Sequence, residues 1–411
     1  MTLQMNRNSI LRRLAITAVT IPAFLSFADA GEYGKAVIDD KSPISSSPWS
    51  ICSLFDYSTL YEGDGLIKEV ALTGRYHGQY ISQTEEEGGA SNGFHNWQHR
   101  RARLGFDVEF AGNLTFVSSI NISDGSGSSF GLTRGVFFDD WDELFVKWEP
   151  SDDVYVLVGK TKQKITMENM ESSKRILTVE RSQIVNEVIA SDYPWGALVG
   201  FNLFGIDQEV GFWLTGGEVD STGERWKFPS PDGRGGFTYR GNLPVSDATQ
   251  LYFGYQFTNN ASGFANGSGN ADSDHGSQYE HVAHIGTKSE WGKLGLITDV
   301  IAASNRESSG PIAAGNDTWG FVVLPYYNVT DKLQFVAKYA YMDEGRQQRY
   351  QRYFVRQYLD GYHTFYAGFN YYICGQKLKL MGGYEYATVN EFTTGADIDS
   401  SSWVFAVRSY W

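Results

Sequence analysis

The connections between the alternating segments of this chain are themselves alternately short and long, and few folds allow that pattern. Sixteen segments place apolar and polar residues in turn, which is the period of a β-strand. These segments are residues 67–80, 97–111, 113–122, 141–149, 153–164, 196–204, 206–216, 235–244, 248–258, 279–291, 293–304, 317–328, 332–343, 362–373, 377–389 and 401–411. Short turns are expected at 112, 150–152, 205, 245–247, 292, 329–331 and 374–376. Long polar loops are expected at 81–96, 123–140, 165–195, 217–234, 259–278, 305–316, 344–361 and 390–400.

Short turns on one rim and long loops on the other are typical of bacterial outer-membrane barrels. A soluble β-sandwich also alternates along each strand, but it does not predict this regular order of connections. Sixteen strands leave a water-filled lumen, whereas about eight are filled by side chains. We therefore predict an all-β fold, a transmembrane antiparallel β-barrel of 16 strands over residues 67–411, with long extracellular loops and short periplasmic turns.

Individual strands support this reading. The chain ends in Trp403–Trp411, an alternating strand closed by an aromatic residue. In the segment that begins at Arg101, one face carries Ala102, Leu104 and Phe106 and the other carries charged residues. Such a strand can contact lipid on one side and water on the other once its edges are closed into a barrel.

The first residues have the features of an export signal. Three arginines precede an apolar stretch of 14 residues, 14–27, and Ala28-Asp29-Ala30 follows. We predict a signal peptide over residues 1–30 that is cleaved before Gly31, because 14 apolar residues are too few to cross the hydrocarbon core. Residues 31–66 are then read as a periplasmic N-terminal segment, and the mature protein is expected in the bacterial outer membrane.

The chain is strongly acidic. Its formal net charge is −14, and removal of three arginines and one aspartate with residues 1–30 changes it to −16. This charge argues against a nucleic-acid partner, and also against assuming a positively charged pore. The mean hydropathy of −0.33 would not suit a bundle of membrane helices, but the strands of a barrel average to polar.

The longest connection, residues 165–195, is too long to be a bare turn. A loop of this kind that folds into the lumen narrows the pore, where charge selects among ions. We expect opposed charges that produce a transverse field at the constriction; the cations are Lys174, Arg175 and Arg181, and the anions are Glu168, Glu171 and Glu180. The alternative is a solvated loop whose charges lie outside.

Two further groups of cations are candidates for the pore wall. Arg75, Arg101 and Arg103 lie on strands with clean apolar opposite faces. Lys160, Lys162 and Lys164 repeat with period two, yet the preceding valines would place them toward lipid. A bulge near Gly159 would turn these lysines into the lumen, and the alternative places them among lipid headgroups.

Four arginines in the connection 344–361 recur every three or four residues, as on one face of a short helix. They are Arg346, Arg349, Arg352 and Arg356. They would form an anion-gathering patch at the outer mouth, or else contact anionic lipopolysaccharide or solvent.

Cys52 and Cys374 both map to the periplasmic rim, so a disulfide between them is plausible in an oxidising compartment. The seven histidines are scattered, and no combination of residues predicts a catalytic site. We expect no enzyme activity, no cofactor and no metal.

Several runs of residues resemble one family. Arg100–Phe106 resembles the early double-arginine strand of the phosphate-selective porin O/P family, and Glu143–Trp148 with Val156–Lys160 resembles its next hairpin. Ser172–Ser182 is similar to its third long loop. Leu72–His77 resembles the first strand of a branch found in planctomycete-like bacteria. The resemblance implies a sixteen-stranded barrel, usually a homotrimer, that conducts small anions passively.

The sequence therefore predicts an outer-membrane porin for small hydrophilic solutes or ions, with a preference for anions, phosphate among them. Its partners would be outer-membrane lipid, lipopolysaccharide and the permeating solutes. Two alternatives remain open at this point. One is a general or cation-preferring porin of the same fold, and the other is a plugged barrel that acts as a structural or adhesive surface protein.

Overall fold

The structure is a computed structural model. It describes residues 51–55, 58–122, 140–189, 193–214, 235–259, 279–304, 317–345, 359–391 and 397–411. The chain divides into two compact units, Met1–Lys35 and Ala36–Trp411, and every described residue belongs to the second. The predicted signal peptide and the arginines of 346–356 lie outside the described residues.

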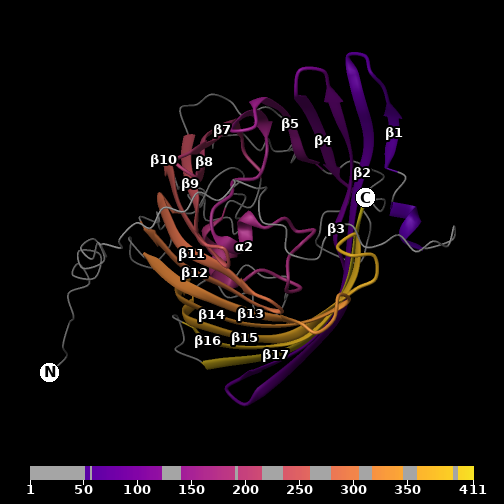
Figure 1. Ribbon diagram of the computed structural model, residues 1–411. Coiled ribbons are helices and arrows are strands. Elements are labelled where there is room, and N and C mark those ends of the chain that lie inside the picture. Colours follow the sequence, from indigo (N-terminus) through magenta and orange to yellow (C-terminus); the bar gives the residue numbers. More distant parts are fainter. Residues whose placement is uncertain are drawn as a thin grey trace, which may run out of the picture. The chain divides into compact units, whose positions relative to one another are not determined.

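The second unit is a closed antiparallel barrel of sixteen strands, β2 to β17 (Figure 1). The strands are β2 (Ile67–Glu87), β3 (Ala90–Phe110), β4 (Leu114–Asn121), β5 (Asp140–Ser151), β6 (Val154–Lys160), β7 (Trp195–Leu203), β8 (Ile206–Leu214), β9 (Gly235–Ser246), β10 (Thr249–Asn259), β11 (His281–Trp291), β12 (Leu294–Ser304), β13 (Thr318–Asn328), β14 (Leu333–Gly345), β15 (Leu359–Tyr372), β16 (Leu378–Glu391) and β17 (Asp397–Tyr410). Each strand pairs with the next, and β17 pairs with β2 from Tyr410↔Arg75 to Ile398↔Glu87. Closure leaves no long strand edge without a partner, as a bilayer requires.

Side chains alternate between the two faces of the wall as the sequence predicts. In β17, Trp403 and Phe405 are exposed on the outside, whereas Val404 and Ala406 are buried inside. The exposed aromatic residues suit contact with lipid, because burial in the bilayer replaces burial in a protein core. Within the described ranges, no helix has the length and apolar character needed to cross a membrane.

The predicted short turns are confirmed, but the predicted loop 81–96 is wrong. β2 continues to Glu87 and β3 starts at Ala90, so the two strands form a long hairpin. Its turn is Gly88–Gly89, with φ of 55° and 86°, which glycine adopts without strain. Both faces of the hairpin tip are polar, so hydrophobic alternation stops there although the strand pairing continues.

The predicted strand 153–164 is shorter than expected, because β6 ends at Lys160. Gly159 has φ of 140°, and the chain then leaves the wall. Residues 161–189, the described part of the connection before β7 apart from its last residues, are called the lumen loop below. They include two short helices, α2 (Met167–Met170) and α3 (Gln183–Val188). In Figure 1, α2 lies inside the ring of strands.

The described residues before β2 form a small structure of their own. The 3-10 helix η2 (Ile51–Phe55) is followed by β1 (Thr59–Glu62), which pairs antiparallel with the start of β2. β1 takes the edge of β2 that lies beyond the end of β17. The O atom of Ser58, the residue before β1, accepts a hydrogen bond from Leu72 N, and two residues further along β2 Gly74 N donates to Trp411 O. β1 therefore extends the wall past the C-terminus.

Candidate channel constriction

The lumen loop packs on an apolar part of the inner wall. Ile184, Val185 and Val188 of α3 are fully buried against inward residues of β11 to β14, among them Val322 and Met342. Sequence reasoning missed this contact although a signal was present. β13 is apolar on both faces, since Val322, Leu324 and Tyr326 point inward and Trp319 and Phe321 point outward. An inner face that contacts water would be polar. An apolar inner face therefore predicts that another part of the chain packs against it.

Polar wall side chains bind the next part of the lumen loop through its backbone. They come from four adjacent strands, β14 to β17. The bonds are Lys379 Nζ to Ile176 O (2.9 Å), Asn370 Nδ2 to Leu177 O (2.9 Å), Arg408 Nη2 to Val179 O (2.5 Å) and Lys338 Nζ to Glu180 O (2.9 Å). This extended segment is therefore held along its length by buried donors, two lysines and one arginine among them.

Glu180 is the last residue of that segment, and its side chain contacts β2 and β3, on the other side of the β17–β2 pairing. Its Oε1 accepts hydrogen bonds from Arg100 Nε at 2.8 Å and Gln79 Nε2 at 3.1 Å. Burial would raise the pKa of Glu180, but Arg100, Arg101 and Arg408 outweigh it and hold the pKa at about 2. The carboxylate is thus charged and acts as an anchor of the loop.

Arg100 reaches Glu180 because β3 carries an extra residue at this point. His77 pairs with Arg101 and Gly78 pairs with His99, so Arg100 has no partner in β2. A β-bulge of this kind breaks the strict alternation. Both Arg100, which reaches Glu180, and Arg101, whose Nη1 lies 3.5 Å from the buried His77 Nδ1, are then on the inner side.

The other predicted loop charges have different partners from those expected. Arg181 donates to backbone oxygens, Nε to Glu168 O at 2.8 Å and Nη2 to Glu171 O at 3.1 Å. Glu168 Oε2 accepts from Ser182 N at 2.8 Å, and Glu168 Oε1 lies 3.5 Å from Lys338 Nζ. Two predicted anions, Glu168 and Glu180, are therefore paired within the loop and the wall and do not face Arg181 as a row of carboxylates.

Lys174 and Arg175 lie where the loop approaches β2 and β3. Lys174 Nζ is 4.8 Å from the centre of the Tyr410 ring and within electrostatic range of Asp107 and Glu143 on the wall. Burial, followed by the nearby Arg75, lowers the pKa of Lys174. The neighbouring Ser173 Oγ is 2.5 Å from Arg75 Nη1. Arg175 is half-buried, and its backbone N donates to Ser172 O at 2.8 Å.

The three lysines predicted as a ladder do not share a strand face. Lys160 is the last residue of β6, and its buried Nζ donates to Trp141 O. Lys162 Nζ donates to Glu171 O at 3.1 Å, and Lys164 Nζ lies 3.8 Å from Glu209 Oε2. The β5–β6 register is continuous from Val156 to Lys160, and the shift in this pairing lies between Trp148 and Ser151, so no bulge near Gly159 redirects the lysines. The strand ends at Lys160, and the chain then leaves the wall of the barrel.

Two wall arginines form ion pairs with carboxylates of neighbouring strands. Arg103 contacts Asp142 Oδ2 at 2.5 Å and donates to Asn121 Oδ1 at 2.9 Å. Arg240 of β9, which sequence reasoning missed, forms two bonds to Glu209, at 2.8 and 2.7 Å. Such two-point contacts fix the arginine in place and neutralise much of its charge. The signal for Arg240 was its position on the predicted inner face of a strand.

The lumen loop leaves one side of the barrel less covered. Inward residues of β10 to β17 are mostly buried, for example Asp299, Val336 and Ala387. Inward residues of β3 to β5, such as Asp107 and Glu143, remain half-exposed. Among the described residues, the inner wall is therefore less covered at β3 to β5, where Asp107 and Glu143 lie within electrostatic range of Lys174.

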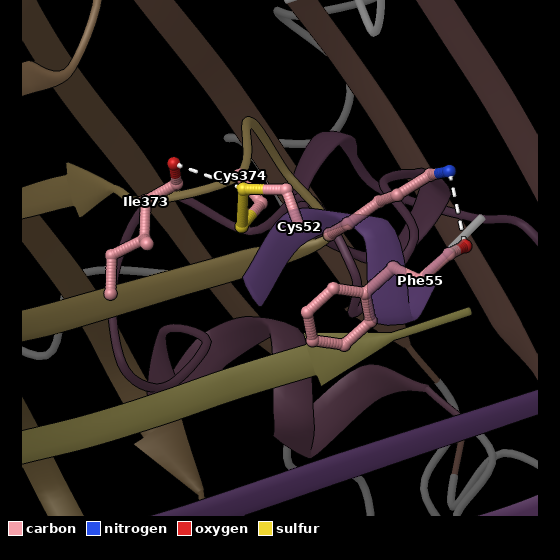
Figure 2. The surroundings of a disulfide bond; sticks show 5 residues. Cys52, Phe55, Ile373 and Cys374 are labelled. Carbon is pink, nitrogen blue, oxygen red and sulfur yellow. Dashed lines mark hydrogen bonds between the residues drawn. A yellow bond between two sulfur atoms is a disulfide. The ribbon is translucent and has the colours of Figure 1, made fainter. Parts of the chain in front are cut away.

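The two cysteines meet at the rim of the barrel (Figure 2). Cys52 of η2 and Cys374, in the turn after β15, form a disulfide with a Cα–Cα distance of 5.3 Å. Lys377 Nζ also donates to Phe55 O at 3.3 Å. The bond joins positions 322 residues apart and holds the N-terminal segment against the turn between β15 and β16.

A family model described as phosphate-selective porin O and P matches residues 70–297, more than half of the chain. No curated protein matches the sequence. Solved structures share the fold at low identity. The outer membrane channel DcaP of Acinetobacter baumannii is 11% identical with a TM-score of 0.54, over 85% of this chain and 99% of that one. An anion-selective porin from Comamonas acidovorans is 13% identical with a TM-score of 0.52, over 83% and 99%. Pseudomonas putida OprB is 10% identical with a TM-score of 0.56, over 83% and 94%.

Proposed function

Because the chain belongs to the phosphate-selective porin O and P family and is thus an outer-membrane channel for small hydrophilic solutes, we propose that its passage prefers small anions. The family and the fold are those of a channel, not of an enzyme. The preference would be set at the lumen loop, where the passage is narrowed and the dielectric response of water is reduced.

One observation carries this proposal: the cations of the lumen loop are less neutralised than its anions. Lys162 and Lys174 are half-exposed, and the hydrogen bond of Lys162 goes to a backbone carbonyl. Glu168 and Glu180, in contrast, are buried and paired with Lys338 and Arg100. Glu171 is the one half-exposed carboxylate among the described residues of the loop, against Lys162, Lys174 and Arg175, so we infer that the loop presents net positive charge to the passage.

The wall supports only a modest preference. Asp107 and Glu143 lie across the passage within electrostatic range of Lys174. Together with the mature net charge of −16, these carboxylates are the specific reason to keep a general or cation-preferring channel as the second candidate. Positive and negative sides of one passage produce a transverse field, which orders water and ions without excluding either sign.

The test is the reversal potential of the purified channel in a planar bilayer under a salt gradient, with and without phosphate. We expect reversal toward the anion potential, and a reduced chloride current when phosphate competes for the same cations. Lys162→Gln and Lys174→Gln should each move reversal toward zero. Lys293→Gln is the matched control, because Lys293 lies in a short turn where its Nζ donates to Val329 O.

Reversal on the cation side in the wild-type protein would overturn the anion preference and keep the channel. Absence of any conductance would instead favour the plugged, structural barrel that the sequence left open. If the lysine variants and Lys293→Gln move reversal equally, the lumen loop does not set the preference.

We also propose that the mature protein starts at Gly31 after export and assembles as a homotrimer. The basic, apolar and small-residue pattern of residues 1–30 supports the first part. The second part rests on the homotrimer that the resemblance to the family implies. N-terminal sequencing of the protein from outer-membrane fractions tests the cleavage site. Chemical crosslinking in mild detergent tests the trimer, which a ladder ending at the dimer or at the monomer would contradict.

A further inference from the structure

Two carboxylates of the inner wall, those of Asp107 and Glu143, have no direct partner. Both side chains are half-exposed, and among the described residues neither forms an ion pair or a hydrogen bond. Other carboxylates of this wall contact a basic side chain of another strand at 2.9 Å or less: Asp142 contacts Arg103, Glu209 contacts Arg240 and Asp299 contacts His284. Asp107 and Glu143 therefore present their charge to the water of the lumen.

The register places these two carboxylates on the same face of the barrel wall. Asp107 of β3 pairs with Val117 of β4, and Ser119, two residues further along β4, pairs with Glu143 of β5. Residues two apart in a strand share a face, so both side chains lie on the lumen side. Phe106, next to Asp107, is 45% exposed on the opposite, outer side.

Lys174 of the lumen loop is a cation within electrostatic range of both carboxylates. It is also half-exposed, and its Nζ lies 4.8 Å from the centre of the Tyr410 ring. Within the described part of the chain it forms no direct ion pair with a carboxylate. Charges of opposite sign thus attract each other from the loop and from the wall without touching, and water reaches all of them.

Glu143 is within electrostatic range of further cations. Arg75 and Lys162 are two of them. Both bind neutral oxygens, since Arg75 Nη1 lies 2.5 Å from Ser173 Oγ and Lys162 Nζ donates to Glu171 O at 3.1 Å. Among the described residues, neither cation is neutralised by direct contact with a carboxylate. This part of the lumen therefore offers separate positive and negative groups to a solute.

We propose that the channel favours zwitterionic solutes, small α-amino acids above all, and that Asp107 and Glu143 determine this specificity. An α-amino acid carries an ammonium and a carboxylate group close together, so the wall attracts one group while Lys174 attracts the other. A small inorganic anion is attracted by Lys174 but repelled by both wall carboxylates, and a neutral solute gains from neither. The inference rests on the proposed function, because the loop cations that attract anions also attract the carboxylate group of the amino acid.

The first experiment measures osmotic swelling of liposomes that contain the purified protein, with two isomeric solutes. Glycine is a zwitterion at neutral pH, whereas glycolamide has the same atoms and no charge, so size does not distinguish them. Protein-free liposomes correct for leakage. Glycine should enter roughly fivefold faster than glycolamide, the factor that corresponds to ~1 kcal/mol for one charge contact in water.

Charge-removing variants assign this specificity. Glu143→Gln should abolish the advantage of glycine over glycolamide and should move the reversal potential in a salt gradient further toward the anion side. A purely structural role of Glu143 would change the two solutes alike. The matched control is Glu149→Gln on the same strand, since this carboxylate is paired with Lys147. The control should keep both the glycine advantage and the wild-type reversal potential.

Equal entry of glycine and glycolamide through the wild-type protein would overturn the proposal, whatever the reversal potential is. A glycine advantage that survives in both Glu143→Gln and Asp107→Asn would equally overturn it, because the wall carboxylates would not be its cause. Reversal on the cation side together with a carboxylate-dependent glycine advantage would support the zwitterion specificity and overturn the anion preference alone. If Glu143→Gln does not fold, Asp107→Asn decides the question by the same two measurements.

Discussion

Arg100 Nε and Glu180 Oε1 form an ion pair of 2.8 Å between a bulge of the barrel wall and the loop that crosses its lumen. Arg100 is the residue of β3 that has no partner in β2, and Glu180 closes the segment that wall donors hold through its carbonyl groups. The pair therefore connects a local irregularity of one strand to the position of the constriction. Together with the wall donors that bind the carbonyl groups of Ile176 and Glu180, it holds the loop against the wall.

Removal of the charge of Glu180 should loosen the lumen loop. Glu180→Gln removes the counter-charge of the buried Arg408 and of Arg100, whose side chain is 32% exposed, and removal of one partner from a buried pair costs up to about 3–5 kcal/mol. We expect noisier single-channel current and a larger mean conductance in planar bilayers. The control is Glu149→Gln, whose carboxylate pairs with Lys147 but is 45% exposed. Equal noise in both variants would contradict this role of Glu180.

The pKa of Glu180 also sets the pH range in which its carboxylate holds the lumen loop. The pKa of Glu180 is held at about 2 in the folded protein, below its ordinary value of 4.5. The unfolded state thus binds the proton more readily, so the stabilisation is complete above pH 4.5 and is lost as pH falls through about 2. We expect current noise to stay constant from neutral pH to about 4 and to rise only in stronger acid. A rise already between pH 7 and 5 would assign the anchoring to another group.

The apolar contact between α3 and the inner wall should stabilise the lumen loop independently of the ion pairs. Ile184 is 1% exposed against the inner wall, so Ile184→Ala should destabilise this contact by about 2–5 kcal/mol. Amide hydrogen exchange of residues 183–188 should become faster, while exchange in the strands stays slow. Asn186→Ala on the half-exposed side of the same helix is the control. Unchanged exchange in Ile184→Ala would show that wall donors alone hold the loop.

The strands and their order could be predicted because each depends on residues close in sequence. Alternation and turn residues are local, and all sixteen strands were placed, with errors mainly at their ends. The strand extensions on either side of Gly88–Gly89 could not be predicted from alternation, because they are polar on both faces. The Gly-Gly pair is itself a hairpin signal. In membrane barrels, strand pairing beyond the bilayer carries no hydrophobic signature.

The partners of the constriction could not be predicted in the same way. Lys338 and Arg408 are single cations on inner faces, and their sequence context does not distinguish a side chain that lines water from one that binds a loop carbonyl. The path of the loop decides this, through contacts between residues more than 150 positions apart. One clue was available: adjacent arginines 100 and 101 in an alternating strand cannot both face water unless a bulge separates them.

The disulfide should stabilise the barrel without changing its conduction. Cys52 and Cys374 close a covalent loop of 322 residues at the rim, and such a bond is typically worth about 2–4 kcal/mol through the unfolded state. The variant with both cysteines replaced by serine should therefore unfold at lower temperature in detergent, yet show wild-type single-channel conductance because neither residue lies in the lumen loop. Intact mass should rise on alkylation only after reduction. Free thiols in the unreduced protein would refute the bond, and altered conductance would show that the N-terminal segment reaches the passage.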